Sequence, residues 1–208
     1  MLPQQYPVNL IVEGKPCLVV GGGPVAAEKA AGLLACGAEV HVVAEQIGTE
    51  VRALPVTWEE RSYNVGEVSG YRLAVAATES GATNKAVYDD GEAAGVWVNS
   101  ADDPDNCSFT LPAVVRRGPL MVTVSTGGRS PALASWLKER LAVEIGPEYE
   151  VLVDLLAAER EAIREGGGST EGRNWQKALD SDMLELIKNG QVADARERLH
   201  ACLSSSSD

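Results

Sequence analysis

The chain has 208 residues, of which 45% are hydrophobic and 5% aromatic, and its formal net charge at pH 7 is −12. This size allows one medium-sized domain and a smaller one, whereas the scarcity of aromatic stacking platforms and the negative charge argue against nucleic-acid or anionic-membrane partners. No apolar run reaches the length of a membrane span, so no transmembrane helix is expected. The first residues lack the basic and apolar regions of a signal peptide, so no signal peptide is expected either.

The cysteines favour a cytoplasmic location. Four of them are widely spaced, with no Cys-x-x-Cys pair: Cys17, Cys36, Cys107 and Cys202. We therefore expect no metal site built from thiolates, and scattered reduced thiols are typical of a cytoplasmic protein. His41 falls in an expected strand, where a packed core residue is a simpler interpretation than a catalyst.

Residues 6–12 are expected to form a short strand. A second run of β-forming residues, 18–20, stops at three glycines, and a helix over residues 25–34 begins at once. A strand that passes through glycines directly into a helix is the setting in which dinucleotide-binding turns occur.

The glycines have the spacing Gly21-x-Gly23-x-x-Ala26, the small-residue variant of the dinucleotide fingerprint. Gly21 allows the tight turn, Gly23 lets the backbone approach a pyrophosphate, and Ala26 lets the helix pack close to the strand. The pyrophosphate would lie on free N–H groups at the helix start. The alternative is a βαβ unit whose glycines serve packing only.

The next elements continue the same alternation. Gly37 closes the helix, a strand covers residues 40–43, and Glu45 then falls 24 positions after Gly21, near where a ribose-binding carboxylate is expected. A carboxylate at that position would repel a 2′-phosphate and so favours NAD over NADP.

Further strands are expected over residues 56–63, 73–77 and 96–99, with a helix over 82–93 before the last. Alternating strands and helices predict an α/β fold with a doubly wound parallel sheet. Ligands of such sheets collect at the carboxyl ends of the strands, here Gly21–Gly23, Thr78 and Asn99.

Two carboxylates, Asp102 and Asp103, follow the last of these strands. A carboxylate on the nucleotide side of the sheet could act as a general base. The alternative is turn chemistry, because Asp-Asp-Pro-Asp-Asn is rich in turn-forming residues, and the residues alone favour the turn.

A strand over residues 120–125 leads into a loop that precedes a helix ending at about residue 143. Ser130 suits the N-cap and Pro131 the first helical position. The loop from Thr126 to Arg129 is therefore a donor-rich segment at a helix start, and we interpret it as a second anion site. The alternative is an ordinary capped helix start.

Residues 111–140 carry a net charge of +4, between flanking segments of −9 and −7. The basic residues of this cationic segment are Arg116, Arg117, Arg129, Lys138 and Arg140. A site for a polyanion explains the segment, and so does a solvated face or a subunit contact. Beyond it, helices are expected over residues 147–165, 174–188 and 191–203, and these carry no recognisable chemistry.

Five sequence blocks together resemble the precorrin-2 dehydrogenase family of siroheme biosynthesis. They are Val-Val-Gly-Gly-Gly-x-Val-Ala (19–26), Ala-Ala-Thr (76–78), Asn-x-x-Asp-Asp-Pro (99–104), Cys-x-Phe-x-x-Pro-Ala (107–113) and Ser-Thr-Gly-Gly-x-Ser-Pro-Ala-Leu-Ala (125–134). The match is collinear from about residue 5 to about residue 160. Two positions depart from the family pattern, because Glu28 and Ser135 stand where arginine is frequent.

The resemblance implies an NAD-dependent enzyme that oxidises precorrin-2, a tetrapyrrole with eight carboxylates, to sirohydrochlorin. It implies an NAD-binding Rossmann domain over residues 1–113, a small α+β dimerisation segment over 114–145 that makes a homodimer, and a C-terminal helical domain over 146–208. Hydride would pass from the macrocycle to the nicotinamide while Asp102 accepts the released proton.

The remaining site residues implied by the resemblance fall into two groups. The nucleotide contacts are Gly21, Gly22, Gly23, Pro24, Val25, Glu45, Gln46 and Thr78. The substrate contacts are Asn99, Arg116, Arg117, Thr126, Gly127, Gly128, Arg129 and Ser130, since guanidinium forks suit carboxylates. Two alternatives remain open: an enzyme that also inserts Fe²⁺ into sirohydrochlorin, and an NAD-sensing regulatory domain without catalysis.

Overall fold

A computed structural model describes residues 4–101 and 103–204, so Asp102 lies outside the described residues. The chain divides into two compact units. The first comprises the described residues up to Leu111 together with Gly127–Arg129, and the second comprises Pro112–Thr126 and the described residues from Ser130 onward. No helix in the described ranges is long and apolar enough to cross a membrane.

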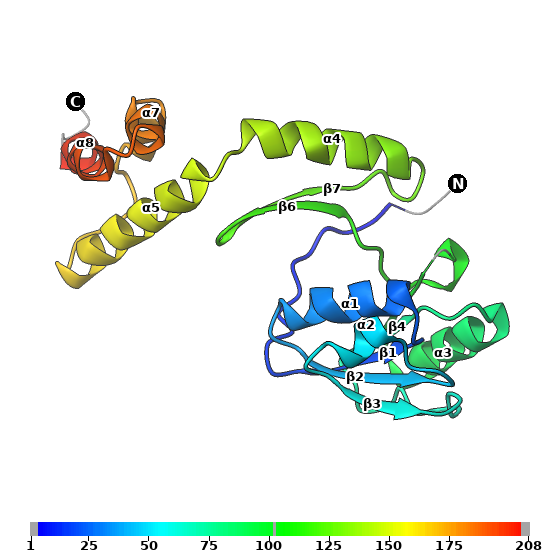
Figure 1. The fold of residues 1–208 in the computed structure, drawn as a ribbon. Coiled ribbons are helices and arrows are strands. Elements are labelled where there is room, and N and C mark those ends of the chain that lie inside the picture. The colour runs from blue at the N-terminus through cyan, green and yellow to red at the C-terminus, as the bar shows by residue number, and fades with distance from the viewer. Residues whose placement is uncertain (1–3, 102, 205–208) are drawn as a thin grey trace. The chain divides into compact units, whose positions relative to one another are not determined.

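Five parallel strands form the sheet of the first unit (Figure 1). They are β1 (Pro16–Val20), β2 (Glu39–Ala44), β3 (Thr57–Glu60), β4 (Leu73–Ala76) and β5 (Trp97–Ser100). Their order across the sheet is β3-β2-β1-β4-β5. The order of the strands therefore reverses between β1 and β4, and sheets of this kind bind ligands at the carboxyl ends of the strands beside such a reversal.

Helices cover both faces of this sheet. On one face α1 (Pro24–Leu34) and the single-turn α2 (Thr49–Arg52) enclose a core that includes Val19, Val42 and Val75. On the other face α3 (Gly81–Ala94) packs over Val20 and Val98. The central strands β1 and β4 read as nearly unbroken apolar runs because both of their faces are buried. The predicted doubly wound α/β sheet is confirmed.

The expected strand over residues 6–12 is wrong. These residues form no strand, and Tyr6 and Ile11 are more than four-fifths exposed, whereas Val12 is buried. The physical reason is that β1, which the segment leads into, already has β2 and β4 on its two sides. No free edge is left beside the strand to which the segment is tethered.

The second unit opens with an antiparallel hairpin of β6 (Ala113–Arg117) and β7 (Leu120–Val124), against which α4 (Pro131–Glu144) packs. Gly118 adopts a φ of +52° in the connecting turn, a conformation that favours glycine. Only β7 is expected from the sequence. The pattern of β6 is weak, because two valines are followed at once by two arginines.

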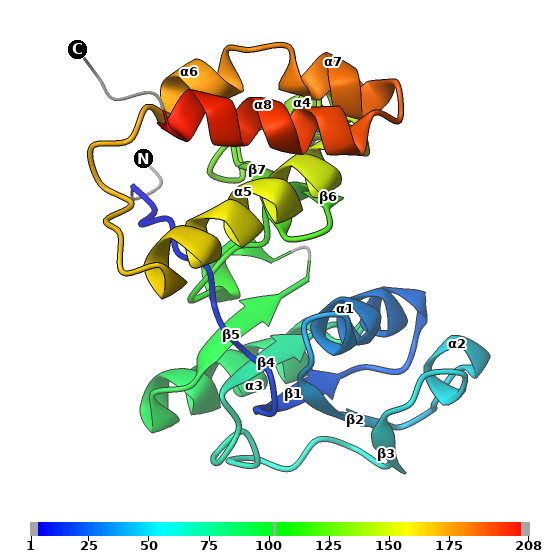
Figure 2. The same ribbon diagram turned by 90° about the vertical axis from the view of Figure 1, so that its left-hand side faces the viewer.

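Four helices, α5 to α8, complete the described part of the second unit (Figure 2). They are α5 (Glu148–Glu165), α6 (Trp175–Leu179), α7 (Met183–Lys188) and α8 (Val192–Ser204), and they share one apolar core. The expected single helix over residues 174–188 is wrong, because it is two helices. The break falls at Asp-Ser-Asp, where the Ser181 hydroxyl donates to the Ala178 carbonyl at 2.6 Å and competes with the helix backbone.

Candidate functional site

In the turn that follows β1, packing is already a sufficient reason for the first two glycines. Gly21 has a φ of +135°, and a Cβ there would overlap the carbonyl oxygen of Ala77. A Cβ on Gly22 would overlap the carbonyl oxygen of Gln46. Two backbone hydrogen bonds fix the turn to the end of β2, Gly21 N to Val43 O and Gly48 N to Gly22 O, both at 2.9 Å.

Gly23 is different, because the protein gives it no reason to be glycine. Its φ is −85°, which any residue adopts, and no described atom lies within 4 Å of a Cβ built on it. It is the N-cap of α1, and no described side chain caps this helix start. Pro24 has no N–H and Ala26 is fully buried, so the exposed Val25 carries the N–H that an anion at this helix end would meet.

Glu45 lies where the sequence places it, at the carboxyl end of β2. Its side chain is exposed, and its Oε1 accepts a hydrogen bond from the Ser62 hydroxyl at 2.8 Å. Gln46, the next residue, is also exposed, and its carbonyl packs on Gly22. The sequence reasoning missed Ser62, which follows β3 in a segment without any recognisable motif.

Thr78 is part of a closed hydrogen-bonding network at the end of β4. Its hydroxyl donates to Asn84 Oδ1 at 2.7 Å and accepts from Ser80 N at 3.2 Å. The Asn84 amide, which is buried, bonds both the N–H of Thr78 (3.2 Å) and its carbonyl (3.0 Å). Thr78 thus shapes the loop at the strand end. Sequence reasoning missed Asn84, whose only signal is a polar residue on the inner face of a helix.

The loop after β5 is organised around Cys107. Its sulfur accepts from Ser100 N at 3.2 Å and lies 3.2 Å from the Asp103 carbonyl, while Asn99 Nδ2 donates to the Phe109 carbonyl at 3.0 Å. Burial raises the pKa of the Cys107 thiol, so it is a structural thiol rather than a nucleophile.

The residues on both sides of Asp102 are held by backbone hydrogen bonds. Ala101 N donates to Ala76 O at 2.8 Å, and Asp103 N donates to Ser100 O at 3.4 Å. A short 3₁₀ turn over Pro104–Asn106 follows, with Asn106 Nδ2 donating to the Asp103 carboxylate at 2.6 Å. The turn chemistry expected from the sequence is therefore present beside Asp102.

The start of α4 is closed by its own side chains. Ser130 Oγ accepts from Leu133 N at 3.2 Å, and Ser130 N donates to Thr126 Oγ1 at 3.0 Å. Gly127 and Gly128 have φ values of +60° and +77°. The predicted N-cap is confirmed, and two of the donors that an anion site would use, the N–H groups of Ser130 and Leu133, are occupied.

The arginines of the cationic segment have unlike surroundings. Arg117 Nη2 donates to the Ala142 carbonyl at 2.7 Å, near the carboxyl end of α4, where a cation is favoured. Arg140 lies over the Trp136 ring, 4.9 Å from its centroid. Arg116 and Arg129 are exposed. Part of the positive charge therefore stabilises the second unit itself.

The first unit brings the described cofactor candidates together at one edge of its sheet, at the carboxyl ends of β1, β2 and β4. Gly21 lies against Ala77, next to Thr78, and Gly22 lies against Gln46. Asn99 lies in the adjacent strand β5. Four substrate candidates belong to the second unit: Arg116, Arg117, Thr126 and Ser130.

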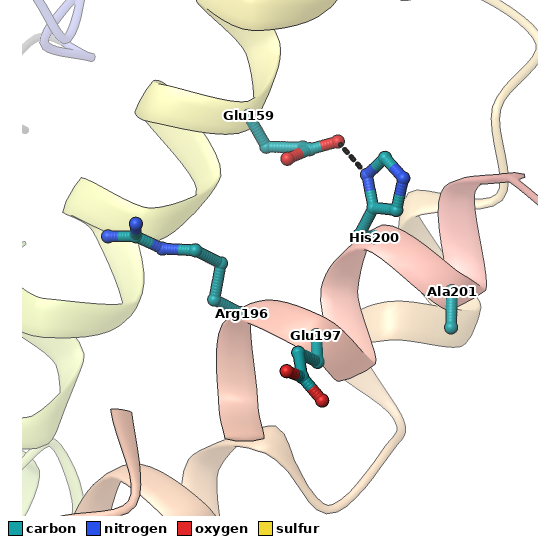
Figure 3. A pocket seen from close by; sticks show the side chains of 5 residues that line it. All are labelled: Glu159, Arg196, Glu197, His200 and Ala201. Atoms are coloured by element: carbon teal, nitrogen blue, oxygen red, sulfur yellow. Dashed lines mark hydrogen bonds and ion pairs between the residues drawn. The ribbon is translucent and has the colours of Figure 1, made fainter. Parts of the chain in front are cut away.

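A separate cavity of about 360 Å³ lies between α5 and α8 in the second unit. Glu159 projects from α5 toward His200 on α8, with Oε1 3.1 Å from His200 Nδ1, and Arg196 and Glu197 complete its polar lining (Figure 3). It contains no candidate from the sequence. In the part of the chain that the structure describes, no group of three His, Cys, Asp or Glu side chains could hold a metal ion.

Two family models match the chain. The model described as putative NAD(P)-binding covers residues 8–113, which is the sheet unit with the open turn at Gly23. The chain belongs to this NAD(P)-binding family. A second model, described as sirohaem biosynthesis protein central, covers residues 117–144, which contain β7 and α4.

Proteins named siroheme synthase are similar to this chain over both of the regions that the family models match. The siroheme synthase of Nitrosomonas eutropha is 37% identical over 210 residues, which cover 98% of this chain and 44% of the relative. That of Nitrosococcus oceani is 37% identical over 206 residues, covering 96% and 44%. The chain therefore spans less than half the length of these relatives.

A solved structure has the same fold. It is named "SirC, precorrin-2 dehydrogenase", has a TM-score of 0.71 and 26% sequence identity, and the match covers 95% of this chain and 98% of that one. The resemblance found in the sequence is confirmed by these comparisons, and so is a nicotinamide dinucleotide as the class of cofactor.

Proposed function

We propose that the chain binds NAD and catalyses the NAD-dependent oxidation of precorrin-2 to sirohydrochlorin. One structural observation carries the proposal: α1 begins without a capping side chain, at a glycine whose missing Cβ faces open space. The names of the relatives, siroheme synthase and precorrin-2 dehydrogenase, support the substrate.

The residues at the turn fit a dinucleotide. A pyrophosphate needs a donor and close backbone approach, which the N–H of the exposed Val25 and the open surroundings of Gly23 offer. Gly21, Gly22 and Pro24 shape this turn. Bound NAD supplies the acceptor for the two electrons and one proton that leave the macrocycle as hydride.

Glu45 and Gln46 are proposed to lie along the adenosine ribose, with Thr78 shaping the opposite side of the site. Glu45 is exposed at the end of β2, where a carboxylate accepts hydrogen bonds from ribose hydroxyls. A 2′-phosphate placed there would meet a like charge. We infer that NAD, rather than NADP, is the cofactor.

Asp102 is proposed as the general base that accepts the second proton released by the substrate. The 100–107 loop supports this role, because its hydrogen bonds fix the backbone on both sides of Asp102. Asn99 at the end of β5 is proposed to help position the substrate. No proton-transfer role is needed for Cys107, since burial keeps its thiol protonated.

The eight carboxylates of precorrin-2 require cations and N–H donors. The proposed partners are Arg116, Arg117, Thr126, Gly127, Gly128, Arg129 and Ser130. Arg129 and Arg116 are exposed and suit this role best. Arg117 has less to offer, because it already donates to the Ala142 carbonyl.

A homodimer is proposed through the outer side of α4. This helix exposes Leu133, Trp136 and Val143, the last of them 85% exposed, while Ala134 is its one buried residue. An apolar helix face of this kind is typical of a protein interface. Sedimentation velocity at micromolar concentration tests the proposal, and a monomer would contradict it.

The decisive experiment incubates the purified chain with precorrin-2 and NAD and follows NADH formation together with the product spectrum. Wild-type chain is expected to form NADH and sirohydrochlorin in equal amounts. Asp102→Asn is expected to bind NAD normally and to slow oxidation by roughly 10²- to 10⁴-fold, the usual contribution of a general base.

Two results would contradict parts of this proposal. NAD binding without any turnover by the wild-type chain would favour a regulatory NAD-binding domain over an enzyme. Full turnover by Asp102→Asn would remove Asp102 as the base while leaving the dehydrogenase activity in place.

A further inference from the structure

The carboxyl ends of β2 and β3 lie side by side at the edge of the sheet. The strands pair in parallel with Ala44 opposite Glu60, and Arg61 N continues the pairing by donating to Ala44 O at 2.7 Å. Arg61 and Ser62 therefore follow β3 directly beside Glu45. This edge is where a Rossmann-type sheet meets the adenosine ribose.

Ser62 controls the orientation of Glu45. Its hydroxyl donates to Glu45 Oε1 at 2.8 Å and bridges two adjacent strand ends. A carboxylate has two oxygens and about four acceptor positions. One oxygen is thus fixed by the protein, and Oε2 remains to accept hydrogen bonds from the ribose hydroxyls.

Arg61 is the cation next to Ser62 in the chain, and each of its three guanidinium nitrogens has a partner in the protein. Nε lies 2.6 Å from Glu59 Oε2, Nη2 lies 2.8 Å from Glu67 Oε2, and Nη1 donates to Ser62 O at 3.0 Å. The hydrogen bond from Arg61 lowers the pKa of Glu59, so this partner stays ionised.

The other arginine at this edge is engaged in the same way. Arg52 Nη2 lies 3.0 Å from Glu60 Oε2, Arg52 Nε donates to Ile47 O at 3.0 Å, and the guanidinium lies over Trp58 at 4.5 Å from the ring centroid. Both positive charges are therefore balanced by carboxylates, while Glu45 has no cationic partner among the described residues.

We propose that this edge selects NAD by two linked devices, an inference that rests on the proposed nucleotide site. Ser62 is a positioning residue that holds Glu45 ready for a free ribose 2′-hydroxyl. Glu59 and Glu67 hold Arg61 away from a 2′-phosphate. The edge thus rejects NADP both by like charge and by withholding the guanidinium that would bind the phosphate bidentately.

The test measures Kd for NAD and for NADP by titration calorimetry on the full chain and compares their ratio between variants. Glu67→Gln removes one charge but keeps an oxygen for the hydrogen bond that Glu67 Oε1 accepts from Asn64 N at 3.2 Å. Freed from this partner, Arg61 is expected to bind the phosphate, and NADP affinity should rise about tenfold while NAD affinity changes little. Glu59→Gln should act in the same direction.

Asp89→Asn is the matched control, because it removes the same charge from an exposed ion pair with Lys85 (2.6 Å) on α3. It should leave the NAD-to-NADP ratio of Kd values unchanged. A rise in NADP affinity as large as that of Glu67→Gln would show a general charge effect and overturn the role of Arg61.

Ser62→Ala tests the positioning role. It is expected to raise Kd for NAD about fivefold, the effect of one lost hydrogen bond, and to leave the weak binding of NADP unchanged. Ser62→Thr keeps the hydroxyl and should restore wild-type affinity. Ser69→Ala, an exposed serine on the same connection between β3 and β4, should change neither Kd.

The outcomes separate this inference from the proposed function. Wild-type chain that binds neither dinucleotide overturns both. Wild-type chain that prefers NAD, together with an unchanged ratio in Glu67→Gln, Glu59→Gln and Ser62→Ala, overturns only the selection by this edge. A lower NAD preference in these three variants but not in the controls supports it.

Discussion

Two helices of this protein begin after a strand and a run of glycines, yet their starts differ. The first, α1, follows Gly21-Gly22-Gly23, and the second, α4, follows Thr126-Gly127-Gly128-Arg129-Ser130. The same helix-dipole physics predicts an anion site at both. Only the side-chain arrangement separates them.

At α4 the protein satisfies its own donors. Ser130 Oγ accepts the N–H of Leu133, and the N–H of Ser130 is in turn accepted by Thr126. At α1 the N-cap is Gly23, and no described side chain takes that place. A helix start left open at a well-packed turn costs stability that a simple serine would recover, which is why the open end indicates a ligand.

The glycines of the two loops also have different reasons. Gly21 and Gly22 are required because neighbouring carbonyl groups occupy the space of a side chain. Gly127 and Gly128 have positive φ angles but open surroundings. Contacts therefore require Gly21 and Gly22, whereas backbone conformation favours glycine at positions 127 and 128.

The largest expected effect is a loss of stability in the first loop, where contacts require glycine. Gly22→Ala forces a Cβ into the Gln46 carbonyl, which is backbone and cannot move alone, and should lower the free energy of unfolding by about 3 kcal/mol. Gly128→Ala meets no described atom and should cost only about 1 kcal/mol for its positive φ. Urea unfolding measures both, and equal losses would show that the two turns are alike.

The next effect is expected at Gly23, where one substitution should change NAD affinity and stability in opposite directions. Gly23 has the extended N-cap conformation, so Gly23→Ser can cap α1 and should raise stability by a few tenths of a kcal/mol, as Ser caps do relative to Gly. The same side chain fills the space for the pyrophosphate. We expect Kd for NAD to rise about 30-fold, the value of one to two charge-assisted hydrogen bonds.

Calorimetry with NAD and thermal unfolding of the same sample check this opposition. A Gly23→Ser chain that binds NAD like wild type would mean that the dinucleotide does not lie on the start of α1. A chain that loses both stability and binding would mean that Gly23 is a packing glycine after all.

The centre of the sheet could be predicted from sequence because β1 and β4 are runs of consecutive apolar residues. Leu73–Ala76 is an apolar run with every residue buried, and Gly95 closes α3 with a φ of +69°. A short apolar run of this length is typical of a strand buried on both faces. The segment over 6–12 leads into β1, whose two sides are already taken by β2 and β4, and this is a property of the assembled sheet.

The positions of the candidate site residues in the fold could be predicted from sequence, but their hydrogen-bond partners could not. Sequence places Gly23, Glu45 and Thr78 at strand ends, and the structure agrees. It does not indicate that Thr78 bonds a buried asparagine, or that Arg117 donates to the end of α4. Such partners are distant in sequence, and only the packed fold decides which donors remain for a ligand.

The smallest expected effect concerns the start of α4, which Ser130 caps. Ser130→Ala removes the cap on Leu133 N and should lower the stability of the second unit by about 1 kcal/mol, with NAD affinity unchanged. Ser130→Asp keeps a capping oxygen and should restore the stability, since aspartate is a good N-cap and suits the positive end of the helix.

The same pair of variants tests whether Ser130 also meets the substrate. A carboxylate at this position would repel the carboxylates of precorrin-2, so Ser130→Asp should raise KM for precorrin-2 while the stability stays near wild type. If KM stays unchanged in both variants, Ser130 is a cap and nothing more, and the proposed substrate contacts at this loop must come from its backbone and from Arg129. If Ser130→Ala alone raises KM at wild-type stability, the hydroxyl serves the substrate rather than the helix, and the contrast between the two helix starts is wrong.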